Sequence, residues 1–186
     1  AGGASHVGFV FFPPSPRHVT FDQAGALAAR VPAQTGKVGV FVDPEDALLD
    51  QAIRATRLDA IQLHRVTPER AAAIGTRTRL PVWAAVAVKA PADLDAANSF
   101  RGAVQRLIYD AKVPDDAKLP GGMGMRFDWT LLQGFTHPLP WALSGGLDPE
   151  NVAEAVTTTG ARLVDVSSGV ESAPDVKDTG KIAAFL

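Results

Sequence analysis

Residues 143–151 read Leu-Ser-Gly-Gly-Leu-Asp-Pro-Glu-Asn, and residues 163–171 read Leu-Val-Asp-Val-Ser-Ser-Gly-Val-Glu. Each stretch begins as an apolar run and ends in glycines and small hydroxyl side chains. Glycine lets backbone amides approach a bound anion, and hydroxyl groups add hydrogen-bond donors. A single Gly-Gly pair is more simply a tight turn, but two such loops in successive units favour a phosphate site. In a (β/α)8 barrel, the loops after the last two strands commonly hold a phosphate. The expected phosphate-binding residues are Gly145, Gly146, Ser167, Ser168 and Gly169.

Apolar runs alternate with helical patterns along the rest of the chain. The runs are near-continuous, as expected of parallel strands covered by helices. Three predicted helix starts place Asp or Thr before Pro and Glu, at residues 43–45, 67–69 and 148–150, and a fourth opens at Thr20. A terminal helix is expected near Val176–Leu186. The seven strand candidates are Gly8–Phe12, Lys37–Val42, Ala60–His64, Pro81–Val88, Arg106–Ala111, Trp141–Gly145 and Leu163–Ser167.

Strand starts recur about every 20–35 residues, which is the length of a βα unit with its crossover. Consecutive βα units form either an open doubly wound sheet or a barrel. A dinucleotide-binding sheet would carry G-x-G-x-x-G after its first strand, whereas this chain continues into Phe12-Pro13-Pro14-Ser15. The sequence therefore predicts an α/β fold, a TIM (β/α)8 barrel with about seven units visible, in one domain over residues 1–186. The irregular stretch Val113–Arg126 follows the fifth strand candidate, and a long loop there is expected to be functional.

Composition excludes several classes of protein. The chain has 186 residues, of which 46% are hydrophobic and 20% charged, so it is expected to fold. Its net charge of −2 argues against binding nucleic acid or an anionic membrane over a broad face. It contains no cysteine, which excludes disulfides, thiolate metal ligands and a cysteine nucleophile among these residues. With no apolar run of membrane-spanning length and no visible signal segment, the expected location is the cytoplasm.

Several strings together resemble one enzyme family. They are GFVFFPPSPRHVT, KVGVFVDPED, LDAIQLH, LIYDAK, LPGGMGMRFDWTLL, LSGGLDPENVAEAV and LVDVSSGVESAPDVKD, in chain order. From Gly8 to the C-terminal helix the chain is similar to phosphoribosylanthranilate isomerase of tryptophan biosynthesis. The resemblance implies an Amadori rearrangement of N-(5-phosphoribosyl)anthranilate, an intramolecular aldose–ketose isomerisation. It also implies a small phosphoribosyl substrate, no metal and no organic cofactor.

The resemblance assigns the general acid to Asp128, within Phe127-Asp128-Trp129. Two flanking aromatic residues are expected to desolvate this carboxyl and raise its pKa, so that it holds a proton near neutral pH. Without the resemblance, a lone Asp before a helix is more simply an N-cap. The resemblance also pairs Arg17 with the anthranilate carboxylate, a task that suits the planar guanidinium. By itself, an Arg in a Pro-rich loop is more often solvated.

The other substrate-binding residues implied by the resemblance are Gln62, His64 and Asp165. Gln62 and His64 alternate along one strand candidate and so face the same side. The alternative for this pair is a core histidine with a polar partner. Asp165 is expected at the C-terminal end of a strand, near the ribose hydroxyls or the amino group of the substrate, with capping as its alternative.

The family's first strand carries V-K-I-C-G, whose cysteine is the general base, and these 186 residues contain no such string. The first strand and most of the first helix are therefore expected to be absent, which leaves two unpaired sheet edges. A longer polypeptide is the preferred explanation, and a truncated chain or completion by another chain are the alternatives. Because no residue replaces the thiolate, little or no isomerase activity is expected of these residues alone.

The sequence departs from the family pattern at two further positions. Arg65 stands where the family usually has glycine after its histidine, and Asp175 stands where it has glycine before Val-Lys-Asp. Asp tolerates the left-handed conformation, so that second turn is expected to survive. The alternative functions are another phosphosugar barrel isomerase or an inactive phosphate-binding fragment. A homodimer, or a fusion with another enzyme of the pathway, is left open.

Overall fold

The computed structural model describes residues 3–114 and 124–186. The middle of the stretch Val113–Arg126, which the sequence marks as functional, lies outside the described residues. In the described part, six strands form one parallel sheet in chain order, β1-β2-β3-β4-β5-β6. This unreversed order is that of a (β/α) barrel rather than a doubly wound sheet. The strands are β1 (His6–Val10), β2 (Gly36–Val42), β3 (Ala60–His64), β4 (Val82–Val88), β5 (Arg106–Ala111) and β6 (Trp141–Leu143).

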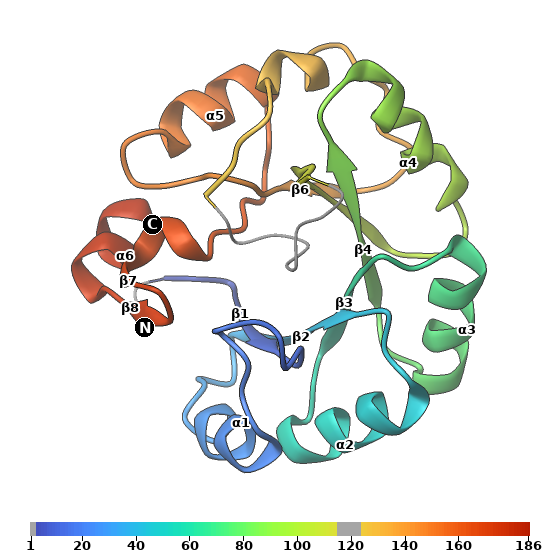
Figure 1. Cartoon of the computed structure of the whole chain (residues 1–186), viewed down its shortest axis with the longest axis vertical. Helices are drawn as coiled ribbons and strands as arrows, with labels where there is room; N and C mark the ends of the chain where they lie inside the picture. Colours follow the sequence, from blue (N-terminus) through green and yellow to red (C-terminus); the bar gives the residue numbers. More distant parts are fainter. Residues whose placement is uncertain (1–2, 115–123) are drawn as a thin grey trace.

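The helices form an outer layer around the curled sheet (Figure 1). A short antiparallel pair, β7 (Glu171–Ala173) and β8 (Val176–Lys177), precedes the last helix. The helices are α1 (Phe21–Ala28), α2 (Asp46–Thr56), α3 (Pro68–Thr78), α4 (Asp95–Ser99), α5 (Val152–Thr159) and α6 (Thr179–Phe185), with 3₁₀ turns η1 (Pro91–Leu94), η2 (Trp129–Leu132) and η3 (Ser168–Val170).

Two of the predicted helix starts are confirmed. Thr20 caps α1 with a reciprocal bond to Gln23, and the Thr67 hydroxyl accepts from the Arg70 amide while Pro68 opens α3. The prediction that Asp43 caps the second helix is wrong. Its φ is +40°, and α2 begins at Asp46 after the extended residue Glu45.

The start predicted at Asp148 needs a smaller correction. The Asp148 carboxylate accepts from the amides of Glu150 and Asn151, so it caps a turn. The helix itself, α5, begins only after Asn151. The terminal helix is likewise shorter than predicted, because residues 176–177 belong to β8 and Asp178 caps α6.

The seventh strand candidate, Leu163–Ser167, is reduced to a single bridge between Val164 and Leu143. Two hydrogen bonds form that bridge. The Leu143 amide donates to the Leu163 carbonyl at 3.0 Å, and the Asp165 amide donates to the Leu143 carbonyl at 2.8 Å. No described strand pairs with the other side of this segment.

The opposite edge of the sheet is β1. Phe11 donates to the Val40 carbonyl, and Ser5 accepts from the Gly36 amide, so the odd-numbered residues of β1 face β2. Alternate residues of a parallel strand bond to opposite neighbours. Gly8 therefore faces away from β2, and its backbone N–H and C=O have no hydrogen-bond partner among the described residues.

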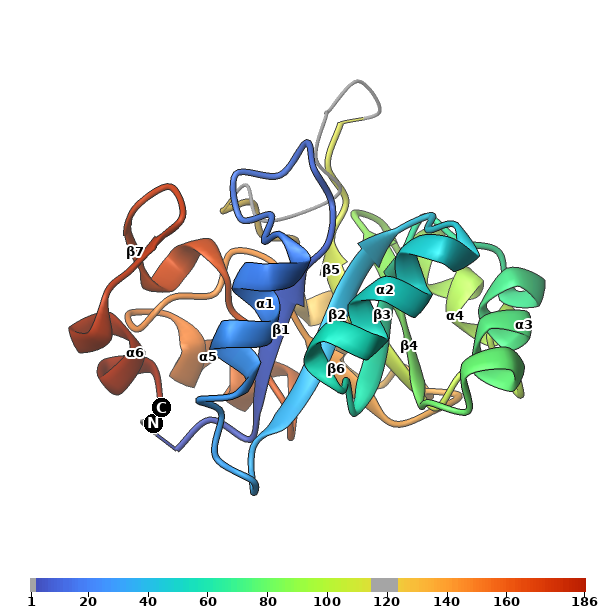
Figure 2. The same ribbon diagram turned by 90° about the horizontal axis from the view of Figure 1, so that it is seen from below.

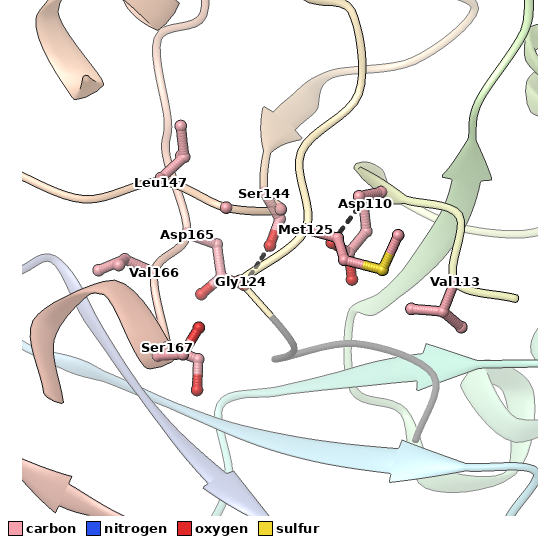
Figure 3. Close-up of a pocket in the computed structure, with 13 residues that line it drawn as sticks. Asp110, Val113, Gly124, Met125, Ser144, Leu147, Asp165, Val166 and Ser167 are labelled. Atoms are coloured by element: carbon pink, nitrogen blue, oxygen red, sulfur yellow. Dashed lines mark hydrogen bonds between the residues drawn. The ribbon is translucent and has the colours of Figure 1, made fainter. Parts of the chain in front are cut away.

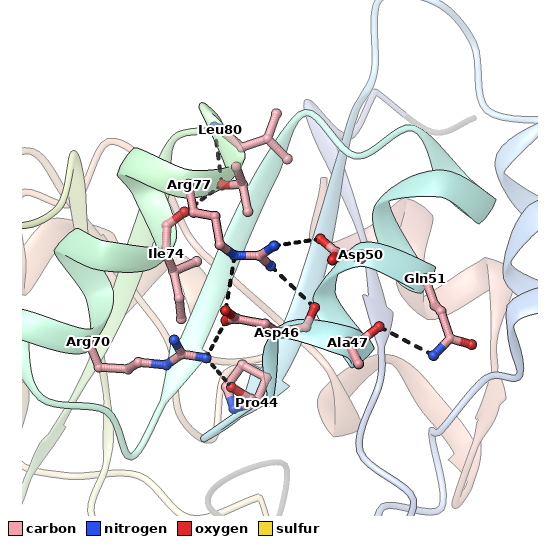
Figure 4. Close-up of polar contacts among 10 residues, drawn as sticks. Pro44, Asp46, Ala47, Asp50, Gln51, Arg70, Ile74, Arg77 and Leu80 are labelled. Atoms are coloured by element: carbon pink, nitrogen blue, oxygen red, sulfur yellow. Dashed lines mark hydrogen bonds and ion pairs between the residues drawn. The ribbon is translucent and has the colours of Figure 1, made fainter.

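Packing on the outside of the sheet combines an apolar core with surface ion pairs. Phe11 and Phe41 are fully buried and stack with ring centroids 5.3 Å apart. Four charged side chains join α2 to α3 (Figure 4). These pairs are partly exposed, so each contributes at most about 1 kcal/mol. They connect Asp46 to Arg70 and Arg77, and Asp50 to Arg77.

Parallel strands bring all their C-terminal ends to one face of the molecule. Figure 2 shows the Pro-rich segment after β1 on the same side as the arrowhead of β2. That face therefore collects the segments in which the sequence places its candidate residues. No helix within residues 3–114 and 124–186 combines the length and apolar character needed to cross a membrane.

Candidate functional site

A small cavity lies between the end of β5 and the segments that follow β6 and Val164 (Figure 3). Its volume is about 30 Å³, enough for about one water molecule. Four of the five predicted phosphate-binding residues line it, together with the predicted substrate-binding residue Asp165. Those four are Gly145, Gly146, Ser167 and Ser168.

The glycines of the first loop approach the neighbouring backbone closely. Gly145 has φ +89°, and a Cβ there would lie 2.6 Å from the Ala111 nitrogen. Gly146 has φ +64°, and its Cβ would lie 2.8 Å from the Met125 carbonyl. Both positions therefore require glycine for conformation and for space.

A larger cavity of about 410 Å³ adjoins the first. It shares Gly146 and Ser168 with the small cavity, and Gly169 and Arg17 also line it. Gly169 is crowded as well, because a Cβ there would collide with the Leu147 carbonyl. The structure thus brings Arg17 next to the second glycine–serine loop, although 150 residues of chain separate them.

Arg17 is held by a carboxylate that sequence reasoning missed. Its Nε and Nη2 donate to the two carboxylate oxygens of Glu171, both at 2.7 Å. Lys177 Nζ also donates to Glu171 at 2.7 Å and to the Ser167 carbonyl at 2.8 Å. Burial opposes the ionisation of Glu171, but the hydrogen bonds from Arg17 and Lys177 outweigh it and lower its pKa to about 2. Glu171 is therefore ionised at neutral pH.

Two buried carboxyls border the small cavity. Asp110, in β5, is 7% exposed, and its Oδ1 accepts from the Ala111 amide at 2.8 Å. Burial, and then the charge of Asp165, raise the pKa of Asp110 to about 7. Burial also raises the pKa of Asp165, which accepts from the Ser144 hydroxyl at 3.1 Å. Sequence reasoning missed Asp110, although its place at the end of an apolar strand, in LIYDAK, is the signal that could have found it.

The expectation that Asp128 is desolvated is wrong in this structure. Phe127 and Trp129 are buried at 8% and 7% exposure, and the side chain between them points the other way, into solvent. Asp128 caps η2, because its Oδ1 accepts from the Thr130 hydroxyl at 2.7 Å and the Thr130 amide at 3.0 Å. These bonds lower the pKa of Asp128. Asp128 lines neither cavity formed by the described residues.

Gln62 and His64 are buried on β3, as their alternation predicts, and Gln62 Nε2 donates to His64 Nε2 at 3.2 Å. Burial, and then the charge of Arg65, lower the pKa of His64 to about 4, so its imidazole is neutral at pH 7. Neither residue lines the two cavities. The hydrogen bond between Gln62 and His64 is the one expected of a core histidine with a polar partner. It does not test whether either residue binds the substrate.

Two of the family departures adopt the left-handed backbone that glycine favours. Arg65 has φ +56°, at a cost of about 1 kcal/mol for a residue with a Cβ. Asp175 has φ +68° between β7 and β8, so the expected turn is confirmed. Within the described residues, no three His, Asp or Glu side chains come together as a metal site.

The chain is similar over its whole length to one family of known proteins. The model of the family described as N-(5'phosphoribosyl)anthranilate (PRA) isomerase matches residues 1–186. N-(5'-phosphoribosyl)anthranilate isomerase of Paramagnetospirillum magneticum is 54% identical over 185 residues, covering 99% of this chain and 86% of the relative.

Solved structures of the same family superpose on the fold. One phosphoribosyl anthranilate isomerase, in complex with reduced 1-(o-carboxyphenylamino)-1-deoxyribulose 5-phosphate, has a TM-score of 0.83 at 32% identity, over 99% of this chain and 86% of that one. Monomers generated from the dimeric enzyme of Thermotoga maritima have a TM-score of 0.82 at 33% identity, with the same coverage. The expected α/β barrel fold is thereby confirmed. Sequence and structure agree that this chain belongs to the N-(5'-phosphoribosyl)anthranilate isomerase family.

Proposed function

We propose that the two adjoining cavities bind N-(5-phosphoribosyl)anthranilate for its conversion to 1-(2-carboxyphenylamino)-1-deoxyribulose 5-phosphate. One observation carries the assignment of the site. The cavity of about 410 Å³ has the predicted phosphate residues Gly146, Ser168 and Gly169 in its wall together with Arg17. The substrate has two anionic ends, a phosphate and a carboxylate. A cavity of this volume suits a small organic ligand.

The glycine–serine loops take the phosphate through backbone amides and the hydroxyls of Ser167 and Ser168. Arg17 takes the anthranilate carboxylate. Two of its five N–H donors point at Glu171, so it has further donors for a second carboxylate. Asp165 contacts the ribose hydroxyls or the amino group, and Gln62 and His64 complete the substrate contacts at the end of β3.

Asp128 donates the proton that opens the furanose ring. In this structure it faces water and is ionised, because its pKa lies below the ordinary value of a carboxyl. A general acid must instead hold its proton near neutral pH, which requires a raised pKa. Catalytic hydrogen bonds often form only in the substrate complex. We therefore assign to the bound substrate the task of covering Asp128 and excluding water from it.

The reaction also needs a base that removes the proton at C2 of the opened iminium. In the family resemblance this base is a cysteine, and the 186 residues contain none. Loss of a general base costs about 10²–10⁴-fold in rate. A polypeptide limited to these 186 residues should therefore bind the substrate and turn it over slowly.

The test is a titration with reduced 1-(2-carboxyphenylamino)-1-deoxyribulose 5-phosphate, followed by fluorescence, together with a turnover assay by chromatography. Saturable binding is expected, at least about tenfold weaker in Ser168→Ala and Arg17→Ala. Ser99→Ala, in α4 and exposed, is the matched control and should bind like the wild type. No saturable binding up to about 1 mM would contradict the proposal. Binding with no turnover at all would favour the inactive, phosphate-binding alternative.

Assembly and location complete the proposal. We propose a homodimer in the cytoplasm, and the dimeric enzyme of Thermotoga maritima is what supports the dimer. Light scattering coupled to size exclusion checks it, since a dimer of this chain has twice the mass of 19.5 kDa. Fractionation of the source cells checks the location, and the sequence flanking these residues in the genome checks for a fusion.

A further inference from the structure

Two acidic side chains share the small cavity with the loops expected to bind an anion. Asp110 and Asp165 both line it, as do Gly145, Gly146 and Ser168. None of the described lining residues is Lys, Arg or His. An anion held where these loops line the small cavity would therefore meet two carboxyls (Figure 3).

Two nearby cations of the described residues are engaged elsewhere. Arg17, in the wall of the adjoining cavity, is bonded to Glu171. Arg126, which packs against Gly146, places its guanidinium over the Trp129 ring.

The elements packed around Asp110 supply little positive charge. Its strand neighbour β4 places Ala87 opposite it, and Ser144 follows β6. The only titratable side chain of the described residues with a resolved effect on Asp110 is Asp165. Lys177 acts on Asp165, but its ammonium is bonded to Glu171 and to the Ser167 carbonyl. Lys112, the next residue but one along the chain, pairs with Asp93.

Asp110 also touches the anion loop directly. A Cβ on Gly145 would lie 2.9 Å from Asp110 Oδ1, so the carboxyl packs against the Gly145 backbone. A negative charge there opposes an anion held by the same loop. At an effective dielectric constant of about 20, two unit charges 4 Å apart interact by about 4 kcal/mol, which is enough to displace a proton equilibrium by pH units.

We propose that Asp110 is protonated when an anion occupies the glycine–serine loops, so that anion binding at this site is coupled to proton uptake from solvent by those Asp110 carboxyls that are still ionised. The inference rests on the proposed phosphate role of these loops and adds a residue to it. Asp110 is a positioning residue: it contacts Gly145, not the reacting atoms. Burial and the charge of Asp165 bring its pKa to about 7, so the proton is available under physiological conditions.

Sulfate is a suitable probe, because it stays a dianion across the pH range in which phosphate itself titrates. Its affinity is measured from the amide NMR shifts of Gly145 and Gly146, at pH 6 and at pH 8.5. The wild type should bind sulfate at least about tenfold more weakly at pH 8.5, since linkage makes the affinity follow the proton. Asp110→Asn, which is neutral at both pH values, should change by less than about twofold. Asp22→Asn, an exposed Asp in α1, is the matched control and should behave like the wild type.

A second measurement holds even if Asp110→Asn folds poorly. The carboxyl carbons of aspartate are titrated by ¹³C NMR in the wild type and in Asp165→Asn. Removing the neighbouring charge should lower the midpoint of Asp110, and adding sulfate to the wild type should raise it. An Asp110 midpoint near pH 4 with sulfate bound would overturn the inference. So would an Asp110→Asn variant that keeps the wild-type pH dependence.

These outcomes separate the inference from the proposed function. Sulfate binding without pH dependence overturns the role of Asp110 and leaves the isomerase site intact. A pH-dependent sulfate site in a protein that does not bind the reduced product supports the role of Asp110 and contradicts the substrate assignment.

Discussion

At the scale of single residues, the conformation of the loop after β6 requires that residue 145 have no side chain, as Gly145 does. Alanine there would combine a left-handed backbone with contacts of 2.6 Å to Ala111 and 2.9 Å to Asp110. Gly134 has a similar φ of +71° but open space around it. Gly134→Ala should cost about 1 kcal/mol from backbone strain alone. Gly145→Ala should cost about 3 kcal/mol or more and abolish sulfate binding.

Urea unfolding of the two alanine variants checks this difference. Because both carry a positive φ, the comparison isolates the close approach to β5. Equal losses of unfolding free energy would mean that the loop moves aside, and the case for a tightly built anion loop would fail.

The bidentate pair between Arg17 and Glu171 is a second residue-scale feature. Glu171→Gln leaves Arg17 and Lys177 without their carboxylate partner, although Lys177 keeps its bond to the Ser167 carbonyl, and should lower the unfolding free energy at pH 7 by about 3 kcal/mol. Asp50→Asn, which removes an exposed carboxylate from Arg77, should cost at most about 1 kcal/mol.

The same pair predicts a pH dependence of stability. The pKa of Glu171 is lowered in the folded state to about 2, from 4.5. Its contribution is therefore complete above pH 4.5 and is lost as the pH falls toward 2. The difference in melting temperature between the wild type and Glu171→Gln should shrink over that window. A difference that stays constant down to pH 2 would contradict the assigned pKa.

Which residues line the site could be predicted from the sequence better than the environment of each side chain. The positions of the glycines and serines in loops after strands followed from local pattern, and the cavities do bring them together. The outward turn of Asp128 did not follow, because it depends on Phe127 and Trp129 filling the core on either side. Glu171 was missed because its partner Arg17 lies 154 residues away.

At the scale of elements, the helix caps at Thr20 and Thr67 are the local signals that the structure bears out. Thr67→Ala should destabilise the protein by about 1 kcal/mol, because the Arg70 amide loses its acceptor. Thr67→Ser keeps the hydroxyl and should restore most of that loss. Thermal unfolding of both variants checks it, and equal melting temperatures for Ala and Ser would show that the cap contributes nothing.

Elements that depend on neighbours were predicted less well. Residues 163–167 have the apolar composition of a strand, yet only Val164 forms a bridge. Whether an apolar run becomes a strand depends on its pairing with a neighbour, and pairing is a property of the sheet. Asp43 has the composition of a cap, but its backbone is left-handed where the chain leaves β2.

At the scale of the whole molecule, two buried groups give stability opposite dependences on pH. His64 has its pKa lowered to about 4, so its contribution is present above pH 6.5 and is lost as the pH falls toward 4. Asp110 has its pKa raised from 3.8 to about 7, so its contribution is present below pH 3.8 and is lost as the pH rises toward 7. The two slopes oppose each other between about pH 4 and 6.5.

Removing either group should leave the effect of the other on the pH dependence of stability uncompensated. In Asp110→Asn, the unfolding free energy should rise with pH more steeply than in the wild type, by up to about 1.4 kcal/mol per pH unit. In His64→Gln the slope should become more negative. Chemical unfolding at five pH values between 4 and 6.5 measures both slopes, and an unchanged slope in either variant would contradict that group's assignment.

The order of the sheet was predictable as a whole, because apolar runs recur from β1 to β6 at the spacing of βα units, with predicted helix starts between the first four strands. The fold could therefore be derived before the site. That the two cavities adjoin could not be predicted, since it depends on how closely the loops approach one another in the folded chain.

Apart from the Val10 carbonyl, which accepts from the Val19 amide, β1 is hydrogen-bonded within the described residues only toward β2, and this has a consequence in heavy water. Val7 and Phe9 send their amide protons toward β2, whereas the Gly8 amide points away from it. Deuterium should enter β1 at alternate positions, with Gly8 labelled early and Phe9 late. A strand bonded on both sides would instead protect every amide, so the spacing of the labels along His6–Val10 reports whether a second strand has docked beside it.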